Sequence, residues 1–145
     1  MKILSRASAS QAEKAFTFAR AYESLTAFRQ KGDLLSAYVL GFSIIEDRIR
    51  AMFVTRYRHD IQQTPSEKKT QQSLTEIIRY LYRKEDLNKE IADSLIKAAR
   101  ERNQIIHAAM WRLDSTTLET VKSIVDLGRQ ADLLCRKQKR KISKQ

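Results

Sequence analysis

Scarcity of glycine and proline is the feature that most constrains the fold of this chain. Its 145 residues include only three glycines and one proline, whereas an all-β sandwich needs such residues at its many turns. The glycine-rich loops of Rossmann and P-loop nucleotide sites are also excluded, since no pair of glycines has the required spacing. The sequence therefore favours an all-α fold, and its length is typical of one domain with a single core.

Helix-capping patterns divide the chain into five expected helices. The expected starts share a short polar side chain ahead of an apolar-periodic run, and they are Ser10, Asp33, Ser73, Asp86 or Asn88, and Thr116. The second helix is expected to reach about His59, the third Arg83 and the fourth Met110. The segment Asp60–Gln72 is polar, contains the only proline and is predicted to be the longest loop. These elements predict an up-and-down bundle of four or five helices.

Two of the expected helices carry an apolar stripe with one charged residue in its middle. The stripes are Val39, Phe42, Glu46, Ile49 and Phe53, and Ile91, Leu95, Ala98, Arg102, Ile105 and Ala109. Residues at such three- and four-residue intervals share one helix face, which normally faces the core. Because an unpaired buried charge is costly, we expect Glu46 to lie within hydrogen-bonding reach of Arg100 or Arg102. Alternatively, Arg102 lies in a cleft where it meets a ligand phosphate.

Positive charge is concentrated at the C-terminal end. The net charge is +11, and Arg136–Gln145 contains six Lys or Arg residues and no acid. We expect residues 1–135 to form one helical domain and residues 136–145 to form a disordered basic tail. Such a tail is either a solubilising end or a segment that attracts a polyanion, of which nucleic acid is the commonest kind in a cytoplasm. The candidate RNA-binding residues are Arg136, Lys137, Lys139, Arg140 and Lys141.

Cysteine, histidine and hydropathy patterns narrow the class of protein further. The single cysteine, Cys135, excludes an intrachain disulfide and is typical of a reducing compartment. No apolar run approaches the roughly 18–20 residues that span a bilayer, and Met1–Ser10 lacks the apolar region of a signal peptide. We therefore expect a cytoplasmic protein with no membrane partner. Two histidines and one cysteine cannot form a closed zinc site without carboxylates, so no metal or cofactor is expected.

The residues around Arg102 are of the types that phosphate chemistry requires. Histidine can transfer protons near neutral pH, and arginine can bind a phosphate through two charge-assisted hydrogen bonds. Asn103 and His107 share a helix face, and Arg100 lies near that face, but Arg102 is about 140° around an ideal helix from His107. Joint action of Arg102 and His107 therefore needs a helix irregularity, long side-chain reach or a second chain. A lone helical histidine is more often a hydrogen-bonded core or surface group than a catalyst.

The arrangement Arg102-Asn103-x-x-x-His107, late in the penultimate long helix of a small basic bundle, resembles the R-polar-x3–5-H motif of HEPN domains. The segment Tyr38–Phe53 also resembles the early helix of that family, which carries an acidic residue inside an apolar stripe. HEPN domains are helical and act in many prokaryotic toxin, phage-defence and CRISPR-associated ribonucleases. The resemblance therefore implies a HEPN-like bundle that cleaves RNA.

The resemblance implies a metal-independent endoribonuclease with Arg102 and His107 as the catalytic pair. Asn103 would be the polar companion, while Glu46 and Arg100 would support the pair. Arg100 also satisfies the looser spacing of the motif, so the assignment of the motif arginine to Arg100 stays open. HEPN ribonucleases are typically dimers with the motif at a shared cleft. A two-fold homodimer would present the motif histidine twice, once as base and once as acid.

One position departs from the family pattern. The minimal nucleotidyltransferase-linked toxins carry a modifiable tyrosine two residues after the motif histidine, and Ala109 stands there in this chain. Neutralisation by that modification is therefore not expected. An antitoxin or another regulatory protein is a further candidate partner.

Two other functions are compatible with the same residues. In the first, a catalytically inactive HEPN-like module binds RNA or a partner protein, and Arg102 and His107 pair with Glu46 or with backbone carbonyls. In the second, a helical adaptor contacts an acidic partner through the basic tail. RNA cleavage in EDTA that is lost in His107→Ala would distinguish the ribonuclease from both.

Overall fold

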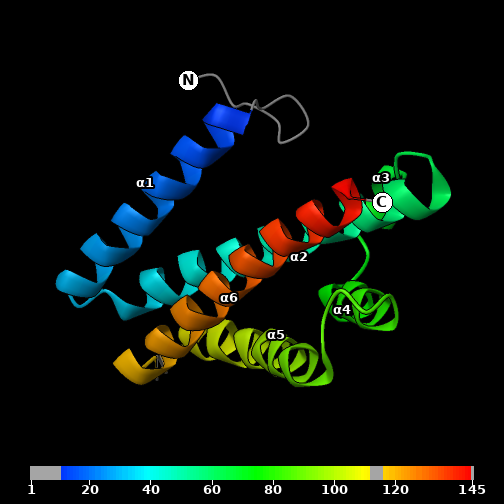
Figure 1. The fold of residues 1–145 in the computed structure, drawn as a ribbon. Helices are drawn as coiled ribbons and strands as arrows, with labels where there is room; N and C mark the ends of the chain where they lie inside the picture. Colours follow the sequence, from blue (N-terminus) through cyan, green and yellow to red (C-terminus); the bar gives the residue numbers. More distant parts are fainter. Residues whose placement is uncertain (1–10, 112–115, 145) are drawn as a thin grey trace.

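The fold is built from helices alone throughout the part of the chain that the structure describes. The computed structural model describes residues 11–111 and 116–144, with the backbone only for residues 11–18. These residues form α1 (Gln11–Gln30), α2 (Leu34–Ile61), α3 (Glu67–Thr70), α4 (Leu74–Arg83), α5 (Lys89–Met110) and α6 (Leu118–Ser143), as Figure 1 shows. The predicted all-α helical bundle is confirmed.

Side-chain caps determine where most of these helices begin. The caps each accept a hydrogen bond from the backbone N–H three residues later, and they are Asp33, Ser66, Ser73, Asn88 and Thr117. For α5 the two predicted caps are resolved in favour of Asn88 over Asp86. The cap of α6 is Thr117, one residue later than predicted. The predicted cap Ser10 lies outside the described residues.

Two segments differ from their predictions. The segment Asp60–Gln72 is not all loop, because α2 continues to Ile61 and Ser66 caps the single turn of α3. The basic segment also is helical, since α6 continues to Ser143. Cys135 and Gln138 are both buried on the inner face of α6, and their burial holds this segment against the core. The expectation of a disordered tail is therefore wrong for residues 136–143.

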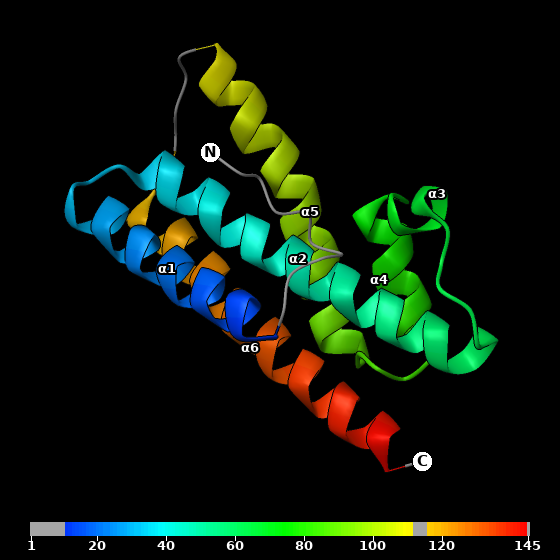
Figure 2. The same ribbon diagram turned by 90° about the horizontal axis from the view of Figure 1, so that it is seen from above.

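The central helix is α2, which contacts α1, α3, α4 and α6. It runs beside α6 in the same direction (Figures 1 and 2). A Cβ atom placed on Gly41 would lie 2.9 Å from Cγ2 of Ile124, and one placed on Gly128 would lie 3.7 Å from Cγ1 of Ile45. These two helical glycines therefore face the contact between α2 and α6, and the packing is tighter at Gly41.

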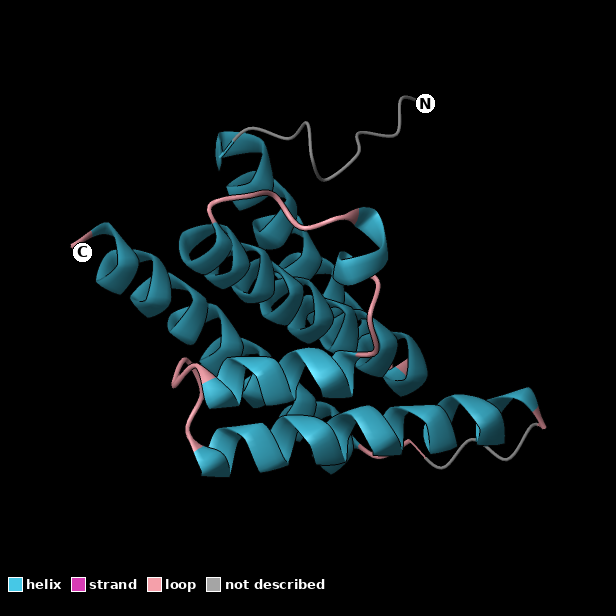
Figure 3. Cartoon of the chain, turned by 90° about the vertical axis from the view of Figure 1, so that its right-hand side faces the viewer, coloured by secondary structure: helices cyan, strands magenta, loops and turns pink. Residues whose placement is uncertain are grey.

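The hairpin of α4 and α5 covers another side of α2. Its buried apolar residues are Leu74, Ile77, Ile78, Leu81, Ile91, Ala92, Leu95 and Ala98. Beyond Ala98 the stripe predicted for α5 is no longer fully buried: Ile105 still packs against the core but is only half-buried, as is Ala109. The last turns of α5 extend past α4, as seen for the long helix at the bottom of Figure 3. The stripe predicted for α2 is also incomplete, since Val39 is 43% exposed.

An added methyl group should affect the stability of the fold differently at the two helical glycines. We expect Gly128→Ala to raise the free energy of unfolding by about 0.5–1 kcal/mol, because alanine favours the helix and its Cβ makes ordinary contacts. Gly41→Ala gains the same helix propensity, but the Ile124 side chain must shift to admit the new Cβ. Urea denaturation should therefore rank Gly128→Ala above Gly41→Ala in stability. Equal stability of the two variants would contradict the tight contact at Gly41.

Candidate functional site

A cavity of about 290 Å³ opens where α2, the start of α4 and the middle of α5 meet. It contains three arginines and one acid among its lining residues. Those residues are Phe42, Glu46, Arg50, Ser73, Leu74, Thr75, Ala99, Arg100, Arg102 and Asn103. Four of the residues singled out from the sequence thus lie together here, namely Glu46, Arg100, Arg102 and Asn103. We call this the Arg102 cavity.

The charge of Glu46 is met by Arg50, one turn later on the same helix. Nε and Nη2 of Arg50 donate to Oε1 of Glu46 at 3.2 and 3.1 Å. Nη1 of Arg50 donates to the carbonyl oxygens of Thr70 and Gln72 at 2.7 and 2.9 Å, which ties the end of α3 and the loop before α4 to α2. Among the described side chains, no hydrogen bond or ion pair joins Glu46 to Arg100 or Arg102. The predicted contact across the bundle is therefore wrong, because an arginine at i+4 is a nearer partner.

Arg102 is held in the cavity by an aromatic ring rather than by an acid. Its guanidinium carbon lies 5.1 Å from the centroid of the Phe42 ring, which is a cation–π contact. The side chain is half-buried. Within residues 19–111 and 116–144, neither Arg102 nor Arg100 makes a side-chain hydrogen bond or ion pair. Their N–H groups are therefore available to an anion.

The first turn of α4 borders the Arg102 cavity, although its own acid, Glu76, offsets part of the positive potential of the helix end. Leu74 and Thr75 line it, directly after the capping residue Ser73. The N-terminal end of a helix carries partial positive charge and favours anions. Because Arg50 neutralises Glu46, the surplus charge of Arg100 and Arg102 and this helix end act together. The arrangement is suited to a phosphate group.

His107 lies outside the Arg102 cavity. It is exposed near the end of α5, and its ring centroid is 6.3 Å from that of Trp111. The helix is uninterrupted from Lys89 to Met110, so the irregularity that could have brought His107 toward Arg102 is absent there. Five residues of regular helix place the two side chains about 140° apart around the axis. One chain therefore does not bring Arg102 and His107 together.

The predicted RNA-binding residues lie on the outer surface of the last turns of α6. They are all exposed, and they are Arg136, Lys137, Lys139, Arg140 and Lys141. Arg136 also pairs with Asp132 at 2.9 Å. Between them, Gln138 points inward and donates to Asp86 Oδ2 at 3.0 Å and to the Met52 carbonyl at 3.0 Å. The basic end of α6 is thereby fixed beside the turn that joins α4 to α5.

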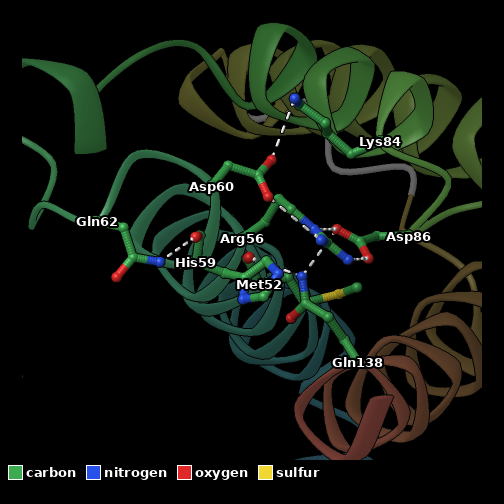
Figure 4. A network of polar contacts seen from close by, with 8 residues as sticks. All are labelled: Met52, Arg56, His59, Asp60, Gln62, Lys84, Asp86 and Gln138. Atoms are coloured by element: carbon green, nitrogen blue, oxygen red, sulfur yellow. Dashed lines mark hydrogen bonds and ion pairs between the residues drawn. The ribbon is translucent and has the colours of Figure 1, made fainter. Parts of the chain in front are cut away.

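A buried ion pair holds that turn in place (Figure 4). Nε and Nη2 of Arg56 donate to the two carboxylate oxygens of Asp86 at 2.8 and 2.7 Å. The Asp86 side chain is 1% exposed. Hydrogen bonding to Asp86 raises the pKa of the Arg56 guanidinium. Asp60 extends the network, since it lies 3.5 Å from Arg56 and 3.2 Å from Lys84.

Sequence reasoning missed Arg50 and Phe42 as parts of the cavity. The four-residue spacing of Glu46 and Arg50 is a signal for their ion pair, and the shared stripe of Phe42 and Glu46 is a signal that Phe42 also faces Arg102. Cys135 is not a nucleophile here, because burial raises the pKa of its thiol. In the described part of the chain, no three His, Cys, Asp or Glu side chains cluster so as to hold a metal ion. No helix in that part combines the length and apolar character needed to cross a membrane.

Tyr38 tests whether water is excluded from the packed side chains near Arg102. Its side chain is fully buried, its hydroxyl has no hydrogen-bond partner among the described residues, and burial raises the pKa of the phenol to about 12. Folding thus favours the neutral phenol, so this contribution to stability is present below pH 10 and is lost as pH rises from 10 to 12. We expect Tyr38→Phe to be as stable as the wild type or more so at pH 7, and to lose less stability between pH 9 and 11.

Urea denaturation at these pH values measures the difference. Tyr82→Phe is the control, since the Tyr82 side chain is 44% exposed. A loss of more than about 1 kcal/mol in Tyr38→Phe at pH 7 would show that the hydroxyl has a partner.

The chain matches no protein-family model, no curated protein and no solved structure in the three comparisons made. A function for it therefore rests on the residues of the site.

Proposed function

We propose that this chain is a metal-independent endoribonuclease whose active site is completed by a second copy. The observation that carries the proposal is the division of the motif between two surfaces. Arg102 and Asn103 line a cavity suited to phosphate, while His107 is exposed on the end of α5 that extends past α4. The resemblance of this motif to that of HEPN domains supports the same assignment.

The proposed chemistry needs two proton transfers and one site of charge stabilisation. One imidazole takes the proton of the RNA 2′-hydroxyl, and the 2′-oxygen attacks the adjacent phosphorus. The bond to the 5′-oxygen breaks, and that oxygen takes a proton from a second imidazole, which leaves a 2′,3′-cyclic phosphate and a 5′-hydroxyl. Arg102 would neutralise the negative charge that develops on the phosphorane.

A symmetric dimer supplies the second imidazole. Met110 and Trp111, beside His107, are 77% and 68% exposed, and large apolar side chains gathered at one helix end favour a protein contact. Contact of two such ends about a two-fold axis would present His107 twice. It would also allow His107 of one chain to act beside Arg102 of the other. The two side chains would then not need to meet within one chain, where they lie about 140° apart around the helix.

The second candidate function is RNA binding without cleavage. The separation of His107 from the Arg102 cavity favours it, because the described residues of a single chain then offer the cavity no free acid or base. Glu46, the one carboxylate in the lining, is engaged by Arg50. An RNA-binding module of this kind would need only the arginines of the cavity and the basic end of α6.

Loss of His107 should abolish cleavage while leaving the fold unchanged. We expect the wild type to cleave a labelled RNA in EDTA, and His107→Ala to lower the single-turnover rate about 10²–10⁴-fold, since it removes a proton-transfer group. His59→Ala is the matched control and should keep full activity. Circular dichroism verifies that each variant is helical. Full activity of His107→Ala would contradict the proposed mechanism, and RNA binding without cleavage by the wild type would favour the second candidate.

The chain should be a homodimer through the end of α5. Sedimentation velocity at micromolar concentration should give a dimer for the wild type and a monomer for Trp111→Asp, because a charge at the contact must be desolvated. Leu133→Asp is the control, since Leu133 is also exposed, at 54%, but lies on α6. A wild type that sediments only as a monomer would contradict the two-chain site.

A further inference from the structure

A second hollow, of about 350 Å³, lies along the groove between α4 and α5. It combines cations, one exposed aromatic ring and small apolar residues. Its lining residues are Arg79, Tyr82, Lys89, Ala92, Asp93, Ile96 and Arg100. We propose that this α4–α5 groove binds single-stranded RNA and leads it to the Arg102 cavity. The choice of RNA rests on the proposed function.

The charge of the groove calls for an anionic occupant. Arg79, Lys89 and Arg100 face one acid, Asp93. Among the described residues, none of these three cations makes an ion pair, although Arg and Lys elsewhere in the fold do. Cations that the fold leaves unneutralised along one groove attract a phosphate backbone.

Tyr82 distinguishes a single strand from other anions. It is 44% exposed at the groove and is not among the residues packed against the core. Proteins that bind single-stranded nucleic acid combine a positive groove with aromatic rings on which bases stack. The bases of a duplex are already stacked on one another and cannot use such a ring. An acidic protein segment would use the cations but gain little from the aromatic face.

The groove meets the Arg102 cavity at one of its ends. Arg100 lines both the groove and the Arg102 cavity. At the other end, Tyr82 and Lys89 flank the turn that contains Asp86, and Asp86 accepts a hydrogen bond from Gln138 on the basic end of α6. From Lys89 to Arg102 the helix rises about 20 Å, enough for several nucleotides. A strand bound along the groove would thus reach the cavity.

The test measures binding apart from cleavage. All variants are made in the full chain that carries His107→Ala, and fluorescence anisotropy reports their affinity for a labelled oligouridine and for an RNA duplex of equal length. We expect tighter binding of the single strand. Tyr82→Ala should weaken that binding roughly 5-fold or more, Tyr82→Phe should retain it, and the affinity for the duplex should not change.

A matched pair of arginines tests the role of the cations. Arg79→Ala should weaken binding of the single strand and lower the salt slope by about one. Arg83→Ala removes an exposed arginine of the same helix that lines neither hollow and should have a smaller effect. Circular dichroism verifies that the variants remain helical.

Three results would contradict the binding of single-stranded RNA in the α4–α5 groove. They are equal binding of duplex and single strand, no effect of Tyr82→Ala, and displacement of the RNA by polyglutamate as effectively as by unlabelled oligouridine. Cleavage assays on chains that retain His107 test the ribonuclease activity separately from RNA binding in the groove. Cleavage with an unchanged KM in Tyr82→Ala would contradict RNA binding in the groove and support the ribonuclease. Tyr82-dependent binding without cleavage would support RNA binding in the groove and contradict the ribonuclease.

Discussion

The close approach of α2 and α6 at Gly41 and Gly128 is the contact on which the rest of the structure depends. A side chain larger than hydrogen would push the two helices apart at Gly41, where an added Cβ would lie 2.9 Å from Ile124, whereas Gly128 has room for a methyl group. Because α6 packs so closely on one side of α2, few positions of α2 are exposed. The α4–α5 hairpin packs on another side of α2. The Arg56–Asp86–Gln138 network fastens the other end, since it joins α2 and α6 to the turn of that hairpin. The Arg102 cavity lies between these two fixed points.

Local signals allowed much of the fold to be predicted from the sequence. Caps such as Ser73 and Asn88 act within one turn, so their spacing alone places helix starts. Errors arose where distant contacts decide the outcome. The composition of residues 136–145 indicates disorder, but Cys135 and Gln138 bury one face of the same helix. Likewise, a stripe of residues on α2 predicts which positions could face the core, not which neighbours cover them, and Val39 remained exposed.

The candidate site could be predicted only in part, for the same reason. Residue types and spacing identified Arg102 and Asn103, which line a cavity, but gave no information on which surface the neighbouring His107 would occupy. Glu46 was paired with the wrong arginine, because a sequence shows that a charge needs a partner without showing which partner is nearest. Arg50 pairs with Glu46 and neutralises it. The charge of the Arg102 cavity is therefore set by Arg100 and Arg102.

The fold divides its cations into two groups, and this division indicates where a ligand would act. On α2, Arg50 and Arg56 are each engaged by a carboxylate, and both also fasten neighbouring segments. On the α4–α5 hairpin, the arginines that line the groove and the cavity make no such pairs among the described residues. The hairpin as a whole is nearly balanced in charge, since residues 74–110 contain seven Lys or Arg and six Asp or Glu. Its groove and cavity are nevertheless places where arginines lack acidic partners within the described part of the chain, and an anionic ligand bound there would neutralise them.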